Sequence, residues 1–301
     1  MSDQLIPELS YIDIKDENKE ALEKLKSALT EYGFFTITDH GLSSDLLAKS
    51  YDLSKDFFNL PTDIKKNYAF PQNAGARGYT PFGKETALGE VTPDQKEFWH
   101  HGPCIDNSYD KRIHTNISVE EMDHFNNNFD ELFIAINTLG MDVLRVIAVI
   151  LNKEPSFFDS WAIKGNSLLR LIHYPPVTDD SNNLRARAHE DINLITLLVG
   201  AEESGLEVKS KKGEWIPIKA SSNAIVCNIG DMMQLVTDGM LLSTTHRVIN
   251  YSNSRSKSRY SMPFFLHPAP NIVLKSIFND DDEGVLADEF LNERLKAIKL
   301  Y

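Results

Sequence analysis

The chain has 301 residues, and its 42% hydrophobic content is enough to bury a substantial core, which argues against a disordered chain. The formal net charge of −13 at pH 7 argues against a general affinity for nucleic acid or for an anionic membrane. The only cysteines, Cys104 and Cys227, lack metal-ligand spacing and exclude a disulfide framework, and the first residues show no secretory signal. We therefore expect a soluble, cytoplasmic protein.

Helical periods come first along the chain. Residues 16–33 predict an amphipathic helix that ends at Gly33. Its apolar face consists of Ala21, Leu22, Leu25, Ala28 and Leu29. The run "FFTITDHG" at 34–41 predicts a short strand, and residues 43–61 predict a second helix that begins at a serine cap and ends at Pro61.

An irregular region and then a long helix follow. Residues 70–107 are rich in glycine, proline and aromatic residues, so they predict a loop with short strands, of a kind that often carries function. A capping box between Ser118 and Glu121 predicts the start of a helix that runs to about residue 152. The most apolar run within it, residues 143–151, contains Arg145 and is too short to span a bilayer.

Strand-like runs dominate the second half of the chain. They lie at 168–175, 188–200, 206–210, 214–220, 224–239, 245–251 and 259–268, and turn-rich segments separate them. So many short strands in about a hundred residues are typical of a β-sandwich, a barrel or a jelly roll. Residues 280–301 predict an acidic turn followed by an amphipathic helix.

The segment "AHEDINLITLLVG" places His189 and Asp191 two positions apart at the head of an otherwise apolar strand. Side chains two apart on a strand face the same way, so these two are predicted to project together. A His-x-Asp pair also arises by chance, in which case both are ordinary surface residues. His246 opens another strand-like run and offers a third ligand. Two imidazoles and one carboxylate are the ligands of non-haem Fe(II) oxygenases, which keep coordination positions open.

Arg259 and Ser261 follow His246 by thirteen and fifteen residues and alternate onto one face of a strand. A guanidinium and a hydroxyl group together suit a carboxylate. An arginine directed into a barrel requires an anion, whereas an arginine on the strand surface does not. The apolar run "MPFF" that follows favours the inward direction.

Together these segments resemble the isopenicillin N synthase-like branch of the Fe(II)/2-oxoglutarate-dependent dioxygenases. "HEDINLITLL", "NIGDMMQLVTDGMLLSTTHRV" and "RYSMPFF" are similar to its catalytic core, and "YGFFTITDHGL" and "KDFFNLPTDIKKNY" to its N-terminal region. The resemblance implies a mixed α+β fold with a double-stranded β-helix (jelly-roll) core. Residues 1–117 would form a helical and loop region packed on residues 118–301, which supply a spine helix and the core as one structural unit.

The resemblance also implies the site residues and the reaction. The iron ligands would be His189, Asp191 and His246. The residues that hold the distal carboxylate of 2-oxoglutarate would be Arg259, Ser261 and Tyr174. Fe(II), 2-oxoglutarate and O2 would then oxidise a small molecule, most often by hydroxylation, and release succinate and CO2. The chain departs from the family at Ile172, where asparagine is common, and at Glu190, where threonine is common. We expect Glu190 to face away from the metal.

Candidate substrate contacts come from the irregular region and the mouth of the sheet. They are Arg77, Tyr79, Phe82, Phe98, Trp99, His100 and Phe265. Arg77 and His100 would suit a substrate that bears a carboxylate, whereas core packing is the alternative for each aromatic residue. The remaining histidines, His267 among them, are interpreted as surface, capping or packing residues, and Asp231 as part of a Gly-Asp turn.

Two alternatives use the same residues. An Fe(II) oxidase of the same branch would dispense with 2-oxoglutarate, and Arg259 and Ser261 would bind the carboxylate of the substrate itself. A jelly roll that binds a metal without turnover is the second alternative. The sequence names neither the substrate nor the oligomeric state.

Overall fold

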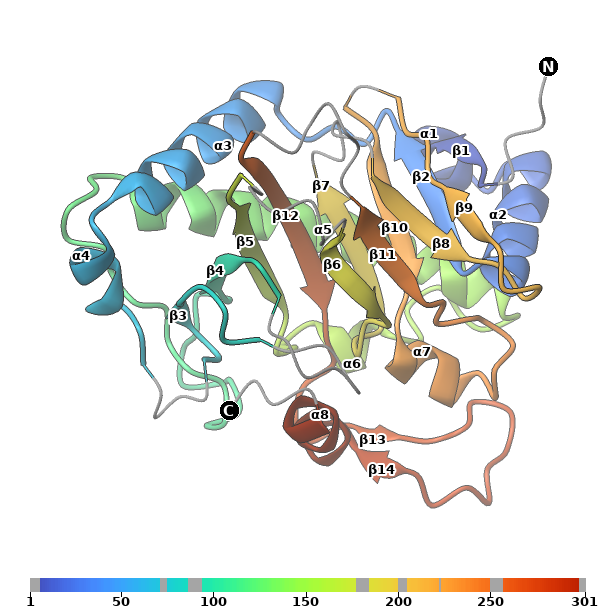
Figure 1. Cartoon of the computed structure of the whole chain (residues 1–301). Helices are drawn as coiled ribbons and strands as arrows, with labels where there is room; N and C mark the ends of the chain where they lie inside the picture. The colour runs from blue at the N-terminus through green and yellow to red at the C-terminus, as the bar shows by residue number, and fades with distance from the viewer. Residues whose placement is uncertain are drawn as a thin grey trace.

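Two β-sheets form the centre of the computed structural model, which describes residues 6–70, 75–85, 94–176, 184–199, 205–221, 223–249 and 257–297 (Figure 1). The larger sheet has the strand order β1 (Glu8–Ser10), β2 (Phe34–Thr38), β10 (Ile225–Ile229), β7 (Ile195–Val199), β12 (Arg259–Leu266), β5 (Leu168–Tyr174), β4 (Glu97–His101) and β3 (Gly78–Thr80). The smaller sheet has the order β6 (Leu184–His189), β11 (His246–Ile249), β8 (Leu206–Lys209) and β9 (Trp215–Pro217). Only β1 and β2 pair in parallel; the other described ladders are antiparallel.

The two sheets face each other across an apolar layer. Ile172 and Val226 of the larger sheet pack in one cluster with Ala186, Val208 and Val248 of the smaller sheet. Each of these side chains alternates with outward-facing neighbours along its strand, because the side-chain period of a strand is two. This double-layered arrangement is the predicted jelly roll, and its inner face carries the candidate site.

The helices of the described chain are α1 (Tyr11–Lys15), α2 (Lys19–Glu31), α3 (Ser44–Asn59), α4 (Thr62–Lys66), α5 (Phe125–Ile150), α6 (Asp159–Ala162), α7 (Asp231–Val236) and α8 (Ala287–Ala297). Helices α2, α3 and α5 pack against the larger sheet, whereas α7 and α8 lie at one end of the sheets (Figure 1). The spine helix α5 runs behind β7 and β12, and Gly140 permits the close approach. A Cβ atom at Gly140 would lie 2.6 Å from Leu266 and 3.4 Å from Leu197.

Helix α5 is long and apolar enough to cross a membrane by length and composition alone. The apolar segment is therefore longer than residues 143–151, which by themselves are too short to span a bilayer. Most of the apolar window is buried inside the fold, however, where Phe129, Leu132 and Ile136 are fully enclosed. Packing against the sheet therefore accounts for the apolar composition of this helix.

Several local predictions are confirmed. Helices α2 and α3 form where the apolar periods indicated, and the Ser43 side chain caps α3 by accepting from the backbone N–H of Leu46. Gly33 follows α2 with φ +66°, a conformation that glycine adopts without strain. The C-terminal helix α8 is also present.

The predicted capping box at Ser118 is wrong. Helix α5 begins at Phe125, and its N-cap residue His124 has the left-handed φ of 67°. The carboxylate of Glu121 accepts a hydrogen bond from the Tyr68 hydroxyl group instead of closing a cap. This long-range contact holds the preceding turn outside the helix.

Two predicted strands are also interrupted. Residues 224–239 form β10 and then the short helix α7, so Asp231 begins a helix rather than a turn between strands. Residues 188–200 do not form one strand, because β6 ends at His189 and β7 begins at Ile195. Between them the chain crosses from the smaller sheet to the larger one, and the Asn193 amide fixes this crossover by donating to the Ile195 carbonyl oxygen at 2.9 Å.

Candidate active site

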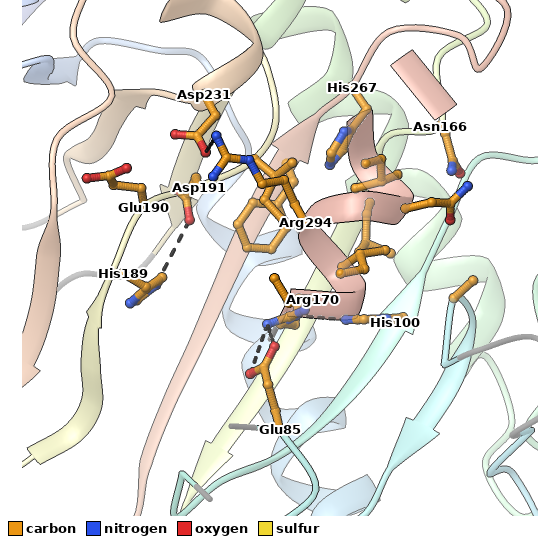
Figure 2. Close-up of a pocket in the computed structure, with 18 of the residues that line it drawn as sticks. Glu85, His100, Asn166, Arg170, His189, Glu190, Asp191, Asp231, His267 and Arg294 are labelled. Atoms are coloured by element: carbon orange, nitrogen blue, oxygen red, sulfur yellow. Dashed lines mark hydrogen bonds and ion pairs between the residues drawn. The ribbon is translucent and has the colours of Figure 1, made fainter. Parts of the chain in front are cut away.

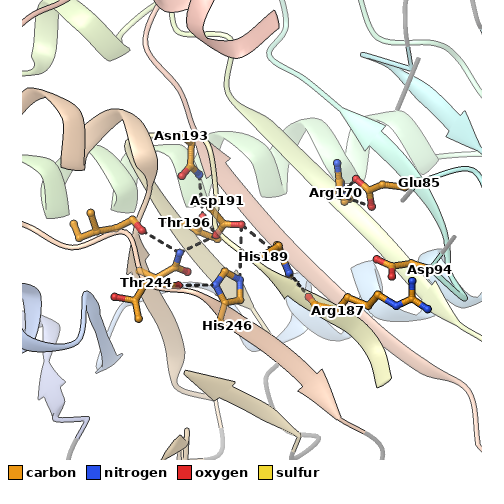
Figure 3. Close-up of polar contacts among 12 residues, drawn as sticks. Glu85, Asp94, Arg170, Arg187, His189, Asp191, Asn193, Thr196, Thr244 and His246 are labelled. Carbon is orange, nitrogen blue, oxygen red and sulfur yellow. Dashed lines mark hydrogen bonds and ion pairs between the residues drawn. The ribbon is translucent and has the colours of Figure 1, made fainter. Parts of the chain in front are cut away.

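Three candidate metal ligands converge where the chain crosses between the sheets. His189 is the last residue of β6 and lies opposite His246, the first residue of β11. Asp191 lies in the crossover. One donor atom from each residue falls within 4.8 Å of the others (Figure 3). Oδ1 of Asp191 is 4.0 Å from Nε2 of His189 and 3.8 Å from Nε2 of His246, which leaves room for an ion between them.

Backbone carbonyl groups fix the tautomer of both histidines. Nδ1 of His189 donates to the carbonyl oxygen of Arg187 at 2.7 Å, and Nδ1 of His246 donates to that of Thr244 at 3.1 Å. Each Nε2 therefore keeps its lone pair, which is the form that binds a metal. Burial, and then the neighbouring His246, lower the pKa of His189 to about 4, so this imidazole is neutral at pH 7.

The two oxygens of the Asp191 carboxylate have different surroundings. Its Oδ2 accepts hydrogen bonds from the Thr196 hydroxyl group at 2.6 Å and from the Asn228 amide at 2.8 Å. Burial alone would raise the pKa of Asp191, but the two imidazoles and these hydrogen bonds outweigh burial and lower it. The ionised carboxylate thus presents Oδ1 beside the two imidazoles, and the three residues fit a divalent cation with open coordination positions.

Removing a hydrogen-bond partner of the Asp191 carboxylate should weaken metal binding. We expect Thr196→Val to lower the affinity for Fe(II) by about 10- to 100-fold, because Oδ2 of Asp191 loses the donor that orients it. Anaerobic Fe(II) titration measures the change. Thr245→Val is the matched control, because the Thr245 hydroxyl donates to Glu190 at 2.8 Å instead. Equal Fe(II) affinities for the two variants would contradict this role of Thr196.

The predicted 2-oxoglutarate residues lie together in the interior. Arg259 of β12 is the ladder partner of Tyr174 in β5, and its guanidinium carbon lies 5.5 Å from the centre of the Tyr174 ring. Ser261 follows on the same face of β12. All three side chains are buried. None of them is among the described residues that line the cavity beside the metal ligands.

A cavity of about 450 Å³ adjoins the candidate ligands (Figure 2). Three of the predicted substrate residues line it, namely Arg77, His100 and Phe265. The lining also includes residues that the sequence did not single out for this role, among them Glu85, Lys96, Asn166, Arg170 and His267. The side chain of Glu190 points away from His189 and Asp191, as expected, although it reaches the cavity wall.

The other four predicted substrate residues do not line the cavity. Tyr79 and Trp99 are packed in the main hydrophobic core. Phe98 belongs to the apolar layer between the sheets, and Phe82 is 46% exposed. Strand alternation separates Trp99 from His100, because successive residues of β4 point to opposite faces.

His100 has a supporting position rather than a free ring. Its Nδ1 donates to the Gly75 carbonyl oxygen at 2.6 Å, and its Nε2 accepts from Nε of Arg170 at 2.7 Å. Burial, and then the charge of Arg170, lower the pKa of His100 well below its usual value. The neutral ring thus orients Arg170, whose guanidinium carbon also lies 4.4 Å from the Phe98 ring centre and 5.4 Å from that of Phe265.

Buried ion pairs balance the charge on this side of the cavity. Lys96 is bonded to Glu85, and its Nζ lies 3.0 Å from the Asp94 carboxylate. Arg170 lies 3.2 Å from Glu85. All four side chains are largely buried. The two positive and two negative charges therefore neutralise one another in a region from which water is largely excluded.

Helix α8 closes the opposite side of the cavity (Figure 2). Arg294 of α8 lies 3.5 Å from Asp231 at the start of α7, and Asp288 of α8 lies 3.5 Å from Arg112. Only Ala287 of this helix is buried. Phe290 and Leu291 are partly buried and pack against the main hydrophobic core, so the helix is attached by apolar as well as polar contacts.

A continued strand pattern could have identified two of the missed residues. Arg170 alternates with Ile172 and Tyr174 along β5, and His267 continues the alternation of Ser261 and Phe265 along β12. His267 is 8% exposed, which agrees with its interpretation as a packing residue. That interpretation did not foresee that His267 also lines the cavity.

The burial of His267 predicts a pH effect on stability. Burial, opposed by Asp191 and reinforced by Arg77, lowers its pKa to about 4, whereas an unfolded histidine has a pKa of about 6.5. Between these values the unfolded chain binds the proton and the folded chain does not, so stability falls as the pH drops below about 6.5. When the pH is lowered from 6.5 to 5, the free energy of unfolding should fall in both proteins. The fall should be smaller in His267→Gln than in the unsubstituted protein, by up to about 2 kcal/mol. Denaturant titration of the metal-free protein measures the difference, and His114→Gln, at an exposed cavity position, is the control.

A jelly roll with two histidines and one carboxylate around a single point has the ligand set of non-haem iron oxygenases. The model of the 2OG-Fe(II) oxygenase superfamily matches residues 165–268, and that of the non-haem dioxygenase N-terminal region, named from morphine synthesis, matches residues 8–121. A 2-oxoglutarate-dependent dioxygenase of Didymella fabae is 31% identical over 297 residues, covering 91% of this chain and 88% of the relative. The chain belongs to the 2OG-Fe(II) oxygenase superfamily.

Solved structures agree with this assignment. A 2OG-Fe(II) oxygenase family protein from Caulobacter crescentus has a TM-score of 0.88 and 39% identity, with 97% of this chain and 99% of that chain covered. A full-length Neurospora crassa protein in complex with alpha-KG has a TM-score of 0.86 and 26% identity, with 99% and 98% covered. The protein is thus an Fe(II)- and 2-oxoglutarate-dependent dioxygenase, which confirms the predicted class and cofactors and does not favour the oxidase that dispenses with 2-oxoglutarate.

Proposed function

We propose that His189, Asp191 and His246 hold Fe(II), that Arg259, Ser261 and Tyr174 hold the distal carboxylate of 2-oxoglutarate, and that the adjoining cavity binds a small polar substrate. The bound iron and cosubstrate supply the oxidising power for a C–H bond. The protein's part is to orient the three ligands, to bury the cosubstrate carboxylate and to hold the substrate beside the metal. We also propose that the protein acts in the cytoplasm, as its two unpaired cysteines suggest.

One observation carries the assignment of the ligands. Both Nδ1 atoms donate to backbone carbonyl groups, and Oδ2 of Asp191 accepts two hydrogen bonds. The atoms that remain, two Nε2 and Oδ1, are those that face one another. A site held together only by ion pairing would not require this division of donors and acceptors.

Anaerobic addition of Fe(II) and then 2-oxoglutarate tests the proposed site. A weak visible charge-transfer band of the chelate is expected only when both are present, and O2 should then release succinate. Protein with Fe(II) but without 2-oxoglutarate is the control. Tight Fe(II) binding without the band, at saturating 2-oxoglutarate, would reject the proposed cosubstrate site.

The nature of the substrate follows from the cavity wall. The expectation of a carboxylate came from Arg77 and His100, but both ring nitrogens of His100 are engaged within the protein. Arg77 donates to the Ala76 carbonyl oxygen at 2.6 Å and to the Asn166 amide oxygen at 3.2 Å. We therefore place neutral polar compounds ahead of carboxylates. Stimulated succinate release, screened with both classes, tests this order.

A further inference from the structure

His267 is held in a fixed position at the end of β12. Its backbone N–H donates to the Ser167 hydroxyl oxygen at 3.2 Å, and the N–H of Leu194 donates to the carbonyl oxygen of the preceding Leu266 at 3.0 Å. The N–H of Asn166 donates to the carbonyl oxygen of Pro268 at 3.1 Å. Bonds on both sides of His267 therefore fix its backbone, and the direction of its side chain is set by the end of the strand.

The imidazole of His267 lies on the cavity wall with an unused nitrogen (Figure 2). The side chain is more than nine-tenths buried, and within the described chain no group forms a hydrogen bond with its Nδ1. Buried polar atoms are usually paired, and an exception on the wall of a cavity suggests a missing partner. His100, on the same wall, has both ring nitrogens bonded within the protein.

The charge of the wall points to the kind of partner. The neutral imidazole of His267 offers one N–H donor and one lone pair. Four basic residues of the wall are paired with acidic residues of the same cavity: Lys96, Arg112, Arg170 and Arg294. A charged substrate would have to compete with these pairs, whereas a neutral polar substrate would leave them intact.

We propose that His267 is a substrate-positioning residue that hydrogen-bonds a neutral carbonyl, amide or hydroxyl group of the substrate and thereby selects the carbon that faces the metal. This proposal deepens the proposed function and rests on it. Arg259 begins β12 and His267 directly follows its last residue, so the substrate and the cosubstrate carboxylate would be held near opposite ends of one strand without overlapping.

The experiment compares His267→Phe, His267→Gln and His40→Phe with the unsubstituted protein. His40→Phe is the control, because His40 lies outside the cavity lining and its ring bonds to the backbone of Leu42 and Asn223. A panel of neutral lactams, nucleobases and alcohols, beside a panel of small carboxylates, is screened for stimulated succinate release. For the best neutral compound, His267→Phe should raise KM by about tenfold, as expected for one hydrogen bond in a desolvated site. It should also lower the ratio of oxidised product to succinate, and His267→Gln should restore part of both losses.

The anaerobic chelate band separates the possible failures. An absent band in the unsubstituted protein refutes the proposed function itself. An intact band in every variant shows that the fold and the cosubstrate site are preserved. If KM and the product ratio of His267→Phe then stay within about twofold of the unsubstituted protein, or if no neutral compound stimulates succinate release, the role of His267 is refuted.

Discussion

Asp191→Ala is expected to abolish succinate formation and to remove most of the affinity for Fe(II). Two imidazoles would remain as ligands, and the negative charge that attracts the cation would be lost. The loss should exceed the roughly 10- to 100-fold effect of removing an outer hydrogen-bond partner, because a ligand itself is deleted. Anaerobic Fe(II) titration and succinate release in air measure the two effects separately.

Glu190→Ala is the control for this substitution. Glu190 is the neighbouring acid, and its carboxylate accepts a hydrogen bond from Thr245 at 2.8 Å rather than facing the two imidazoles. It should keep Fe(II) affinity close to that of the unsubstituted protein. An Asp191→Ala variant that retained iron and full succinate formation would overturn the assignment of the ligands.

Arg259→Ala is expected to raise the 2-oxoglutarate concentration needed for half-maximal succinate release by at least about 30-fold. Loss of one partner of a buried, hydrogen-bonded charge pair costs about 2 kcal/mol or more, which corresponds to this factor. Arg259 is 2% exposed, so its charge acts with little screening by water. At saturating 2-oxoglutarate, much of the turnover should return, because the metal ligands are unchanged.

Arg247→Ala provides the comparison. Arg247 also lies on a strand of the jelly roll, but its Nη2 lies 2.8 Å from Glu207 and its guanidinium stacks over Trp215. The requirement for 2-oxoglutarate should not change in this variant. An equal effect of both substitutions would point to general destabilisation instead of a carboxylate site at Arg259, and the thermal midpoint of each variant would reveal it.

The strand pattern limited the core to a β-sandwich, a barrel or a jelly roll, and the resemblance to the dioxygenase family singled out the jelly roll and the two groups of site residues. Alternation along β12 correctly placed Arg259 and Ser261 on one buried face. The prediction that His189 and Asp191 project from one strand is wrong, because Asp191 lies beyond the end of β6, although the two side chains do lie together. The backbone N–H of Asp231 donates to the Asp191 carbonyl oxygen at 2.7 Å, and a contact between residues so far apart in the chain is not visible in a local pattern.

The cavity wall was harder to predict for a related reason. Trp99 and His100 are adjacent in the chain, yet one is enclosed in the main core and the other lines the cavity. Composition identified the irregular region as functional, but only the pairing of β4 with β5 decides which face each residue occupies. His267 was missed because an isolated buried histidine is more often a packing residue.

The position of helix α8 bears on how the substrate preference of the enzyme can change. It supplies one wall of the cavity, whereas the candidate ligands for iron and 2-oxoglutarate all lie on strands or in the crossover of the jelly roll. Substitutions at the exposed positions of α8 would leave the core intact, whereas Phe290 and Leu291 pack against it. One wall of the proposed substrate cavity can therefore vary while the candidate ligands of iron and 2-oxoglutarate stay the same. Grafting α8 from one relative to another is a direct route to a new substrate preference with the same catalytic centre.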